Sequence, residues 1–419
     1  MYERAVLAGL SADSMADHER SDETSLAELE ALLQTAGGEC RGIVIQSRPA
    51  PDPRSFIGEG KVKEMKALIE AENCTLAVFD NELSPSQMRA LSEDLGVKVL
   101  DRSGLILDIF AQRARTREGK LQVELAQYKY LLPRLAGMWT HLERQAASGT
   151  SSPIGTRGPG ETQLETDRRH IRRKIQKLEQ ELEAVRKVRS TQRRLREKNS
   201  MPVVALVGYT NAGKSTLLNK LTGSNISAND RLFDTLDTTT RRLMISETQE
   251  VLLSDTVGFI RKLPHHLIEA FKATLEELTY ADLLLHVIDA SSPDWEQQYR
   301  VVEGLIRELG AEKTPRIDVY NKVDKCAESI LPHGENKVAV SALTGEGIEE
   351  LIRRINEIIG RENRRVTVLL PYKSAALLEM LHREAYVEKL QYTDEHIIVE
   401  AICSPETYGK LREFVSEVK

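Results

Sequence analysis

The stretch VVALVGYTNAGKSTLLNKL, from Val203 to Leu221, lies near the middle of the 419-residue chain. It begins as an apolar run, continues as a loop framed by glycines, and ends in the apolar spacing typical of a helix. Residues 208–215 match the pattern G-x-x-x-x-G-K-[ST], in the strand-to-helix setting that this motif requires. The stretch therefore predicts a phosphate-binding loop.

Each residue type in this loop has a physical reason to be there. Glycines let backbone N–H groups approach a β-phosphate, and the start of the following helix adds partial positive charge. Lys214 can neutralise phosphate oxygens and stabilise the transition state, and Ser215 can ligate Mg²⁺. We expect nucleotide contacts from Gly208, Tyr209, Thr210, Asn211, Ala212, Gly213, Lys214, Ser215 and Thr216.

Three further motifs follow at the ends of apolar runs. The first has the form D-x-x-G, the second N-K-x-D and the third S-A-L, and they comprise Asp255, Thr256, Val257 and Gly258, then Asn321, Lys322 and Asp324, then Ser341, Ala342 and Leu343. Asp255 can hold magnesium through water, and the N–H of Gly258 can sense a γ-phosphate. The Asp324 carboxylate can accept two hydrogen bonds from guanine, and the N–H of Ala342 can reach its O6. Adenine offers no such donor pair, so the predicted ligand is GTP or GDP.

In order and spacing these motifs resemble the sequence boxes of the translation-factor class of GTPases. The resemblance implies a switch in LFDTLDTTTRR, with Phe233, Asp234 and Thr235 near the nucleotide and Thr235 as a catalytic ligand of Mg²⁺. Thr238, Thr239 and Thr240 lie close enough to compete for that role.

Phe259 follows D-x-x-G, where small signalling GTPases place a glutamine that orients the attacking water. Phe cannot polarise water, so we expect a partner-stimulated GTP hydrolase. The simpler interpretation, that Phe259 packs under the second switch, is compatible with this expectation.

The amino-acid composition argues against several other classes of protein. Hydrophobic residues make up 41% and charged residues 29%, the apolar runs are too short to span a membrane, and the first residues lack the apolar core of a secretory signal. Four scattered cysteines, with no C-x-x-C spacing, argue against a disulfide framework or a zinc site. We expect a cytoplasmic protein without a membrane span, as a monomer.

The sequence predicts an α/β protein with four domains. We predict a parallel α/β domain over residues 1–118 and a long antiparallel helical hairpin over 119–199, whose connection lies in the Gly- and Ser-rich segment 145–163. A P-loop GTPase domain with a mostly parallel sheet follows over 200–361, and a small α+β domain over 362–419. In the last part we expect a strand, a helix, two strands and a final helix.

Outside the GTPase part, FIGEGKVKEM, DNELSPSQ, DRSGLILDIFAQRARTREGKLQVELAQYKYLLPRL and IGTRGPGETQLETDRRHIRRKI resemble the HflX family. The resemblance implies binding to the large (50S) ribosomal subunit and its RNA through the first domain and the hairpin, and dissociation of 70S ribosomes under stress. It also implies that the loop over residues 155–161 reaches toward the peptidyl-transferase region.

Charge supports part of this independently. Residues 161–199 carry 13 Lys and Arg against 7 Asp and Glu, whereas the whole chain has a net charge of −6. Arg157, Arg168, Arg169, Arg172, Arg173 and Lys174 are the candidate RNA contacts. The alternative is a solvated basic helix face.

Other functions share the nucleotide motifs. They include a GTPase of ribosome assembly or RNA modification, and an RNA-binding scaffold that uses GTP as a structural ligand. Gly58 and Gly60 also open a helical pattern; a capping turn is the expected reading there, and an ATP site is the alternative.

Overall fold

The computed structural model describes the chain except residues 1–2, 17–18, 147–158, 198–200, 225–231, 234–238, 247–248, 265–266, 268–275, 327–333, 361–363, 394, 404 and 419. The chain forms two compact units. Unit 1 comprises Met1–Arg186, Asn229–Asp237 and Gly258–Ala273, and unit 2 comprises Lys187–Ala228, Thr238–Val257 and Thr274–Lys419. Two short stretches from among the nucleotide motifs therefore pack with the N-terminal part of the chain.

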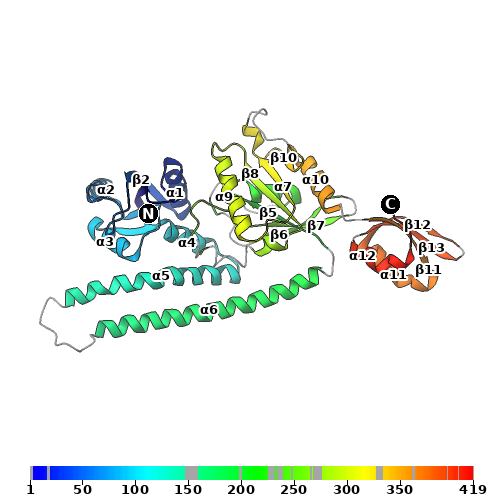
Figure 1. The fold of residues 1–419 in the computed structure, drawn as a ribbon, viewed down its shortest axis with the longest axis horizontal. Helices are drawn as coiled ribbons and strands as arrows, with labels where there is room; N and C mark the ends of the chain where they lie inside the picture. Colours follow the sequence, from blue (N-terminus) through cyan, green and yellow to red (C-terminus); the bar gives the residue numbers. More distant parts are fainter. Residues whose placement is uncertain are drawn as a thin grey trace. The chain divides into compact units, whose positions relative to one another are not determined.

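Unit 1 begins with a four-stranded parallel sheet (Figure 1). Its strands are β1 (Glu3–Ala12), β2 (Gly38–Arg48), β3 (Leu76–Phe79) and β4 (Lys98–Asp101), in the order β2-β1-β3-β4. The helices are α1 (Glu23–Ala36), α2 (Glu59–Ala71), α3 (Pro85–Leu95) and α4 (Arg102–Arg113). The alternation of apolar runs and helical patterns predicted this parallel sheet, and the prediction is confirmed.

Local chemistry fixes where these helices start. The side chain of Asp22 accepts the N–H of Ser25 at the start of α1, and Ser84 accepts the N–H of Gln87 at the start of α3. Both form capping boxes, which satisfy N–H groups that have no partner within the helix. Pro85 suits the first turn of α3, because it lacks an N–H there.

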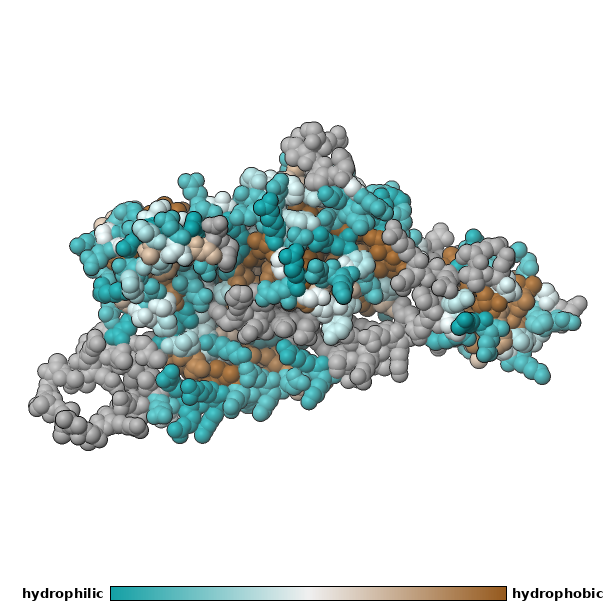
Figure 2. All heavy atoms as spheres, in the orientation of Figure 1, coloured by the Kyte–Doolittle hydropathy of each residue, from teal (hydrophilic) through white to brown (hydrophobic). Residues whose placement is uncertain are grey.

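The hairpin consists of α5 (Arg117–Ala146) and α6 (Pro159–Glu197). Leu121 and Leu125 of α5 pack with Leu178 and Leu182 of α6. Figure 2 shows hydrophilic side chains along α6 and an apolar band on its side toward α5. The four-three spacing of the leucines predicted this pairing.

One boundary of the hairpin differs from the prediction. The segment 145–163 was expected to form the connection, but α6 already begins at Pro159. Proline is compatible with a first helical turn, where its missing N–H costs nothing. The predicted tip, including Gly155 and Arg157, lies outside the described residues.

Asp101 fastens the hairpin to the sheet. Its carboxylate is fully buried and accepts hydrogen bonds from the Gly104 N–H at 2.8 Å, the Tyr130 hydroxyl at 2.7 Å and the Arg134 guanidinium at 2.9 Å. It thus caps α4 and binds α5 with one charge-assisted group. Burial, followed by the neighbouring Asp101 charge, raises the pKa of Tyr130, so the phenol remains a donor.

Unit 2 contains a six-stranded sheet, β10-β9-β8-β5-β7-β6, that is parallel except for β6. The strands are β5 (Val203–Gly208), β6 (Thr239–Met244), β7 (Glu250–Asp255), β8 (Leu283–Asp289), β9 (Arg316–Asn321) and β10 (Lys337–Ala339). Helices α7 (Lys214–Thr222), α9 (Trp295–Glu308) and α10 (Ile348–Gly360) accompany it. The near-continuous apolar strands are buried, as expected for a covered parallel sheet.

The C-terminal part has the element order βαββαβ. It comprises β11 (Arg364–Pro371), α11 (Ala375–Glu384), β12 (Ala385–Tyr392), β13 (His396–Cys403), α12 (Pro405–Leu411) and β14 (Val415–Val418), in the antiparallel order β12-β13-β11-β14. The predicted order of elements ended with a helix, and β14 is an additional strand that was not predicted. That strand has only four residues with two polar ones between its valines, too short a pattern to identify.

Two further expectations concern the described residues only. None of their helices is both long and apolar enough to cross a membrane. No disulfide joins any of the four cysteines within the described part of the chain.

We predict that Tyr130→Phe lowers the free energy of unfolding by about 2 kcal/mol, because buried Asp101 loses a donor. Tyr128→Phe is the matched control: within the part of the chain that the structure describes, the Tyr128 hydroxyl only accepts a hydrogen bond from the exposed Lys174 ammonium, at 2.8 Å. Urea unfolding monitored by circular dichroism measures both variants. Equal losses would contradict the role assigned to Asp101.

Candidate nucleotide-binding site

The predicted phosphate-binding loop lies between β5 and α7. A Cβ atom on Gly208 would lie 2.3 Å from the Val287 carbonyl oxygen, and one on Gly213 would lie 2.2 Å from Asn321 Nδ2. Gly213 also has a φ of 94°, a conformation that favours glycine. Both framing glycines are therefore required by the packing of the loop.

Lys214 folds back over this loop. Its side chain is buried, and its Nζ donates to the carbonyl oxygens of Gly208 at 3.0 Å and Tyr209 at 2.8 Å. Burial lowers the pKa of Lys214 to about 8, against the opposing effect of Asp255. A phosphate would supply the anionic partner that this ammonium needs.

Thr210 provides a second indication of a ligand. Its hydroxyl oxygen is buried and has no hydrogen-bond partner among the described residues. Buried polar atoms are rarely left unpaired without a reason. An oxygen-rich ligand in the loop would satisfy this hydroxyl.

Ser215 and Asp255 form the candidate metal-binding pair. The Ser215 hydroxyl donates to Asp255 Oδ2 at 2.8 Å, and Asp255 is 1% exposed. The register pairs Asp255 with Leu206 of β5, and the Thr256 hydroxyl donates to the Leu206 carbonyl at 2.6 Å. Mg²⁺ prefers hard oxygen ligands and shares them with substrate phosphates, so this pair fits the ion.

Asn321 joins three motifs. Its Nδ2 donates to the Ala212 carbonyl at 2.9 Å, and its Oδ1 accepts the Ala342 N–H at 3.0 Å. The exposed Asp324 accepts the Ser341 hydroxyl at 2.6 Å. The predicted base site is therefore assembled at the carboxyl ends of the strands, beside the phosphate loop. Leu343, also predicted to contact the nucleotide, is 74% exposed at this edge.

The predicted switch residues divide between several places. Asp234, Thr235 and Thr238 lie outside the described residues, so the choice of switch threonine stays a prediction. Thr239 and Thr240 belong to β6, where Thr239 pairs with Asp255 in the register.

Phe233 and Gly258 belong to unit 1. Phe233 is 2% exposed, and its ring packs edge-on against Phe110 with centroids 4.8 Å apart. Its side chain is thus occupied within unit 1, and contact with a nucleotide would need its backbone. Phe259 is fully buried, as expected of a packing residue.

Gly58 takes the simpler of its two predicted roles. It is the N-cap of α2, and its N–H donates to Gln46 Oε1 at 2.8 Å. This donor is already paired within the protein. The geometry is that of the capping turn predicted from the sequence.

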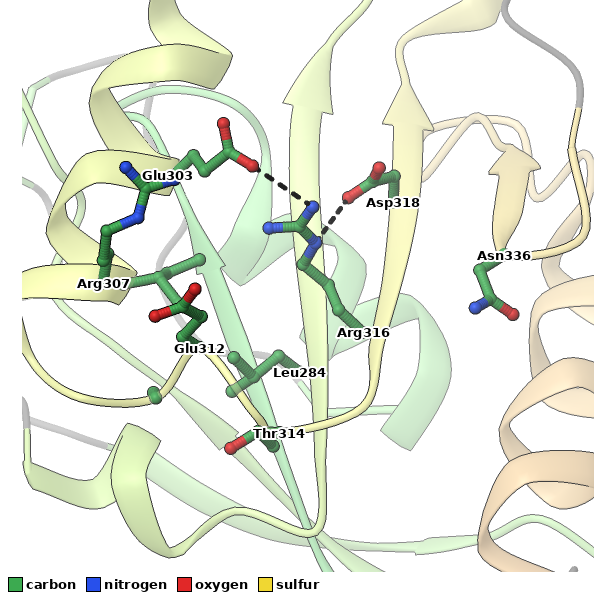
Figure 3. Close-up of a pocket in the computed structure, with 10 residues that line it drawn as sticks. Leu284, Glu303, Arg307, Glu312, Thr314, Arg316, Asp318 and Asn336 are labelled. Atoms are coloured by element: carbon green, nitrogen blue, oxygen red, sulfur yellow. Dashed lines mark ion pairs between the residues drawn. The ribbon is translucent and has the colours of Figure 1, made fainter.

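A separate pocket of about 360 Å³ lies at the opposite, amino-terminal end of β9 (Figure 3). Arg316, the first residue of β9, points into it and pairs with Asp318 at 3.1 Å and with Glu303 at 3.8 Å. None of the predicted nucleotide residues lines the pocket. Its central charge is already neutralised, and it is no part of the nucleotide site.

Some residues around the site belong to none of the sequence motifs. Asp289 at the end of β8 contacts Lys322, and Arg261 and Lys262, just after the D-x-x-G motif, contact acidic residues of unit 1. The position of Asp289 after an apolar strand was a usable signal. Nothing in the local sequence of Arg261 or Lys262 indicates their partners.

A parallel sheet with a phosphate loop, a buried lysine, a Ser–Asp pair and a guanine-type base loop defines a P-loop GTPase. Four family models match in succession: "GTP-binding GTPase N-terminal" over residues 23–111, "GTP-binding GTPase Middle Region" over 113–196, "50S ribosome-binding GTPase" over 203–322 and "HflX C-terminal domain" over 329–403.

Relatives named GTPase HflX match nearly the whole chain. The protein of Caldanaerobacter subterraneus subsp. tengcongensis is 47% identical, over 99% of this chain and 94% of its own length. That of Escherichia coli K12 is 46% identical, over 88% of this chain and 87% of its own length. The chain belongs to the HflX family of GTPases, as its motifs predicted, and it hydrolyses GTP.

The chain also matches solved structures of GTP-binding proteins. The crystal structure of SsGBP with GDP gives a TM-score of 0.47 at 25% identity, covering 86% of this chain and 99% of that one.

The pKa of Lys214 predicts the pH dependence of nucleotide binding. Phosphate should raise this pKa, so binding of GDP at pH 8.5 takes up a proton, whereas at pH 7 Lys214 is already protonated. Affinity should therefore fall as pH rises through about 8. Calorimetry in buffers of different ionisation enthalpy measures the uptake. Lys214→Arg, whose charge does not titrate, is the control, and equal uptake in both proteins would contradict the assignment.

Proposed function

We propose that this GTPase requires Mg²⁺, binds the large ribosomal subunit and promotes dissociation of 70S ribosomes in a GTP-dependent way. The match of residues 203–322 to a family model described as "50S ribosome-binding GTPase" supports the ribosomal part of the proposal. The nucleotide-dependent part of the proposal is supported by one observation: residues 258–273, which begin at the Gly of D-x-x-G, belong to unit 1.

The exposed face of α6 supplies the proposed RNA contacts. Arg169, Arg172 and Arg173 are exposed and form no ion pair within the described part of the chain. Their spacing places them on one side of the helix. Lys174 differs, because it lies 3.8 Å from Glu124 and donates to Tyr128 at 2.8 Å, which engages it within the hairpin. The three arginines are therefore the stronger candidates for phosphate contacts.

A buried carboxylate receives the segment that follows D-x-x-G. Asp80 is fully buried, and Arg102 lies 2.7 Å from it. Lys262 forms a second ion pair with Asp80, and the hydroxyls of Ser21 and Ser25 donate to it at 2.7 and 2.9 Å. Burial works to raise the pKa of Asp80, but the two cations outweigh it and lower the pKa, so the group is an anion.

Neighbouring residues strengthen this attachment. Arg261 lies 3.2 Å from Asp22, the cap of α1, and Lys262 has a φ of 53°, which is unfavourable for a non-glycine residue. Such a conformation persists where several contacts fix it. Arg261 and Lys262 are thus held in one arrangement by two acidic residues of the N-terminal part of unit 1, Asp22 and Asp80.

The proposed cycle follows from these contacts. GTP would occupy the loop over residues 208–215, with Lys214 and Mg²⁺ stabilising charge as water attacks the γ-phosphate in line. Ser215 and, through water, Asp255 would hold the ion, together with Thr235. The N–H of Gly258 would meet the γ-phosphate, and phosphate loss would release the attachment to Asp80. Because Phe259 is buried and apolar, a partner would have to order the attacking water.

We predict that the protein co-sediments with mature 50S subunits when it holds a non-hydrolysable GTP analogue and much less when it holds GDP. The analogue should also increase free subunits at the expense of 70S particles in sucrose gradients. Equal behaviour with both nucleotides would exclude the proposed cycle. Co-migration with immature particles would support a role in assembly instead.

Lys262→Met should shrink the difference between the two nucleotides in 50S affinity to less than about a third, because the segment after Gly258 loses its charged attachment. The affinity for GDP itself should stay within about twofold, since Lys262 lies outside the nucleotide site. Lys66→Met, at an exposed position of α2, is the matched control. A full nucleotide-dependent difference in the Lys262 variant would disprove the coupling.

A further inference from the structure

Asp289 lies at the carboxyl end of β8, next to the base site. The register pairs it with Asn321, the last residue of β9. Its Oδ1 accepts the Ser291 N–H at 3.0 Å and the Ser291 hydroxyl at 2.6 Å, which fixes the orientation of the carboxylate. The other oxygen, Oδ2, remains available for a contact across the strands.

That contact is made by Lys322, the second residue of N-K-x-D. Lys322 Nζ lies 2.6 Å from Asp289 Oδ2 and donates to the Asn211 carbonyl of the phosphate loop at 2.8 Å. One ammonium therefore links the base loop, the phosphate loop and the end of β8. Both side chains of the ion pair are largely shielded, with 22% of Lys322 and 16% of Asp289 exposed.

The backbone shows why this link matters. Lys322 has a φ of 65° and Asn211 a φ of 61°, both in the left-handed region. Such conformations cost about 1 kcal/mol or more for a lysine and persist when surrounding contacts fix them. Lys322 directly follows Asn321 and lies two residues before Asp324, so its backbone conformation determines where the base-reading carboxylate lies.

We propose that Asp289 is a positioning residue of the guanine site. It neutralises and anchors Lys322, and thereby keeps the base loop seated against the phosphate loop. An anchored base loop has to break this link before it can open, so Asp289 slows the release of guanine nucleotides. Among the described residues, the Asp289 side chain forms no hydrogen bond with residues 208–216 or with the Ser341 loop, so the influence of its carboxylate passes through Lys322.

An ion pair at a strand end can also serve stability alone, and nucleotide kinetics separate the two roles. Asp289→Asn keeps the shape but turns an amide or a weaker acceptor toward the ammonium. Release of fluorescent GDP, followed by stopped flow, should become about tenfold faster, the loss expected for one charge-assisted contact. At saturating GTP the turnover rate should change by less than about twofold, because the contact is equally present before and during the reaction.

Two further variants should give a smaller increase in the GDP release rate and no increase, respectively. Ser291→Ala, at an exposed position, keeps the Asp289 charge but removes one of its anchors, and should speed release about threefold. Asp294→Asn is the matched control, because its side chain does not cap α9 and it makes the same charge change five positions away. Its release rate should equal that of the unmodified protein.

A double-mutant cycle identifies the route. In a Lys322→Met background, Asp289→Asn should have little additional effect on GDP release, because the two substitutions remove the same contact. Additive effects, or an unchanged release rate in properly folded Asp289→Asn as judged by its melting temperature without nucleotide, would overturn the proposal. If Asp289→Asn does not fold, an unchanged release rate in Ser291→Ala would overturn it instead.

Discussion

The nucleotide site depends on one buried carboxamide, that of Asn321. It donates to the phosphate loop and accepts from the Ser341 loop, and it is 1% exposed, so no water can replace either partner. Leaving one of its groups unpaired would cost about 1–3 kcal/mol. A Cβ atom on Gly213 would lie only 2.2 Å from Nδ2 of the same Asn321 side chain. The second glycine of the phosphate loop and the asparagine of the base loop are therefore one steric and polar constraint.

The parallel topology of the sheet explains why so much of the nucleotide site was predictable from the sequence. Parallel strands bring their carboxyl ends to one edge of a sheet, so motifs that each follow an apolar run must converge there. Gly208, Ser215, Asp255 and Asn321 were predicted on this basis, and the structure brings them together at one edge. The apolar periodicities likewise predicted the first parallel sheet and the pairing of α5 with α6.

What the sequence did not predict are contacts between single charges far apart in the chain. Asp289 and Lys322 are 33 residues apart, and Asp80 and Lys262 are 182 apart. In a chain with 29% charged residues, one aspartate does not reveal which lysine it meets. The left-handed backbone at Phe233, Lys262 and Lys322 was equally hidden, because side chains of these types give no signal of a positive φ.

The boundary between the two units falls inside the D-x-x-G motif, between Val257 and Gly258. Asp255 belongs to unit 2 with the phosphate loop, whereas Gly258 and Lys262 belong to unit 1. Lys262 is only four residues beyond Gly258, and its ammonium meets a carboxylate that is fully buried. A buried ion pair cannot lengthen gradually, because separating the charges leaves each one desolvated and uncompensated. The attachment is therefore either made or broken, which is the property that the nucleotide-dependent cycle proposed above requires.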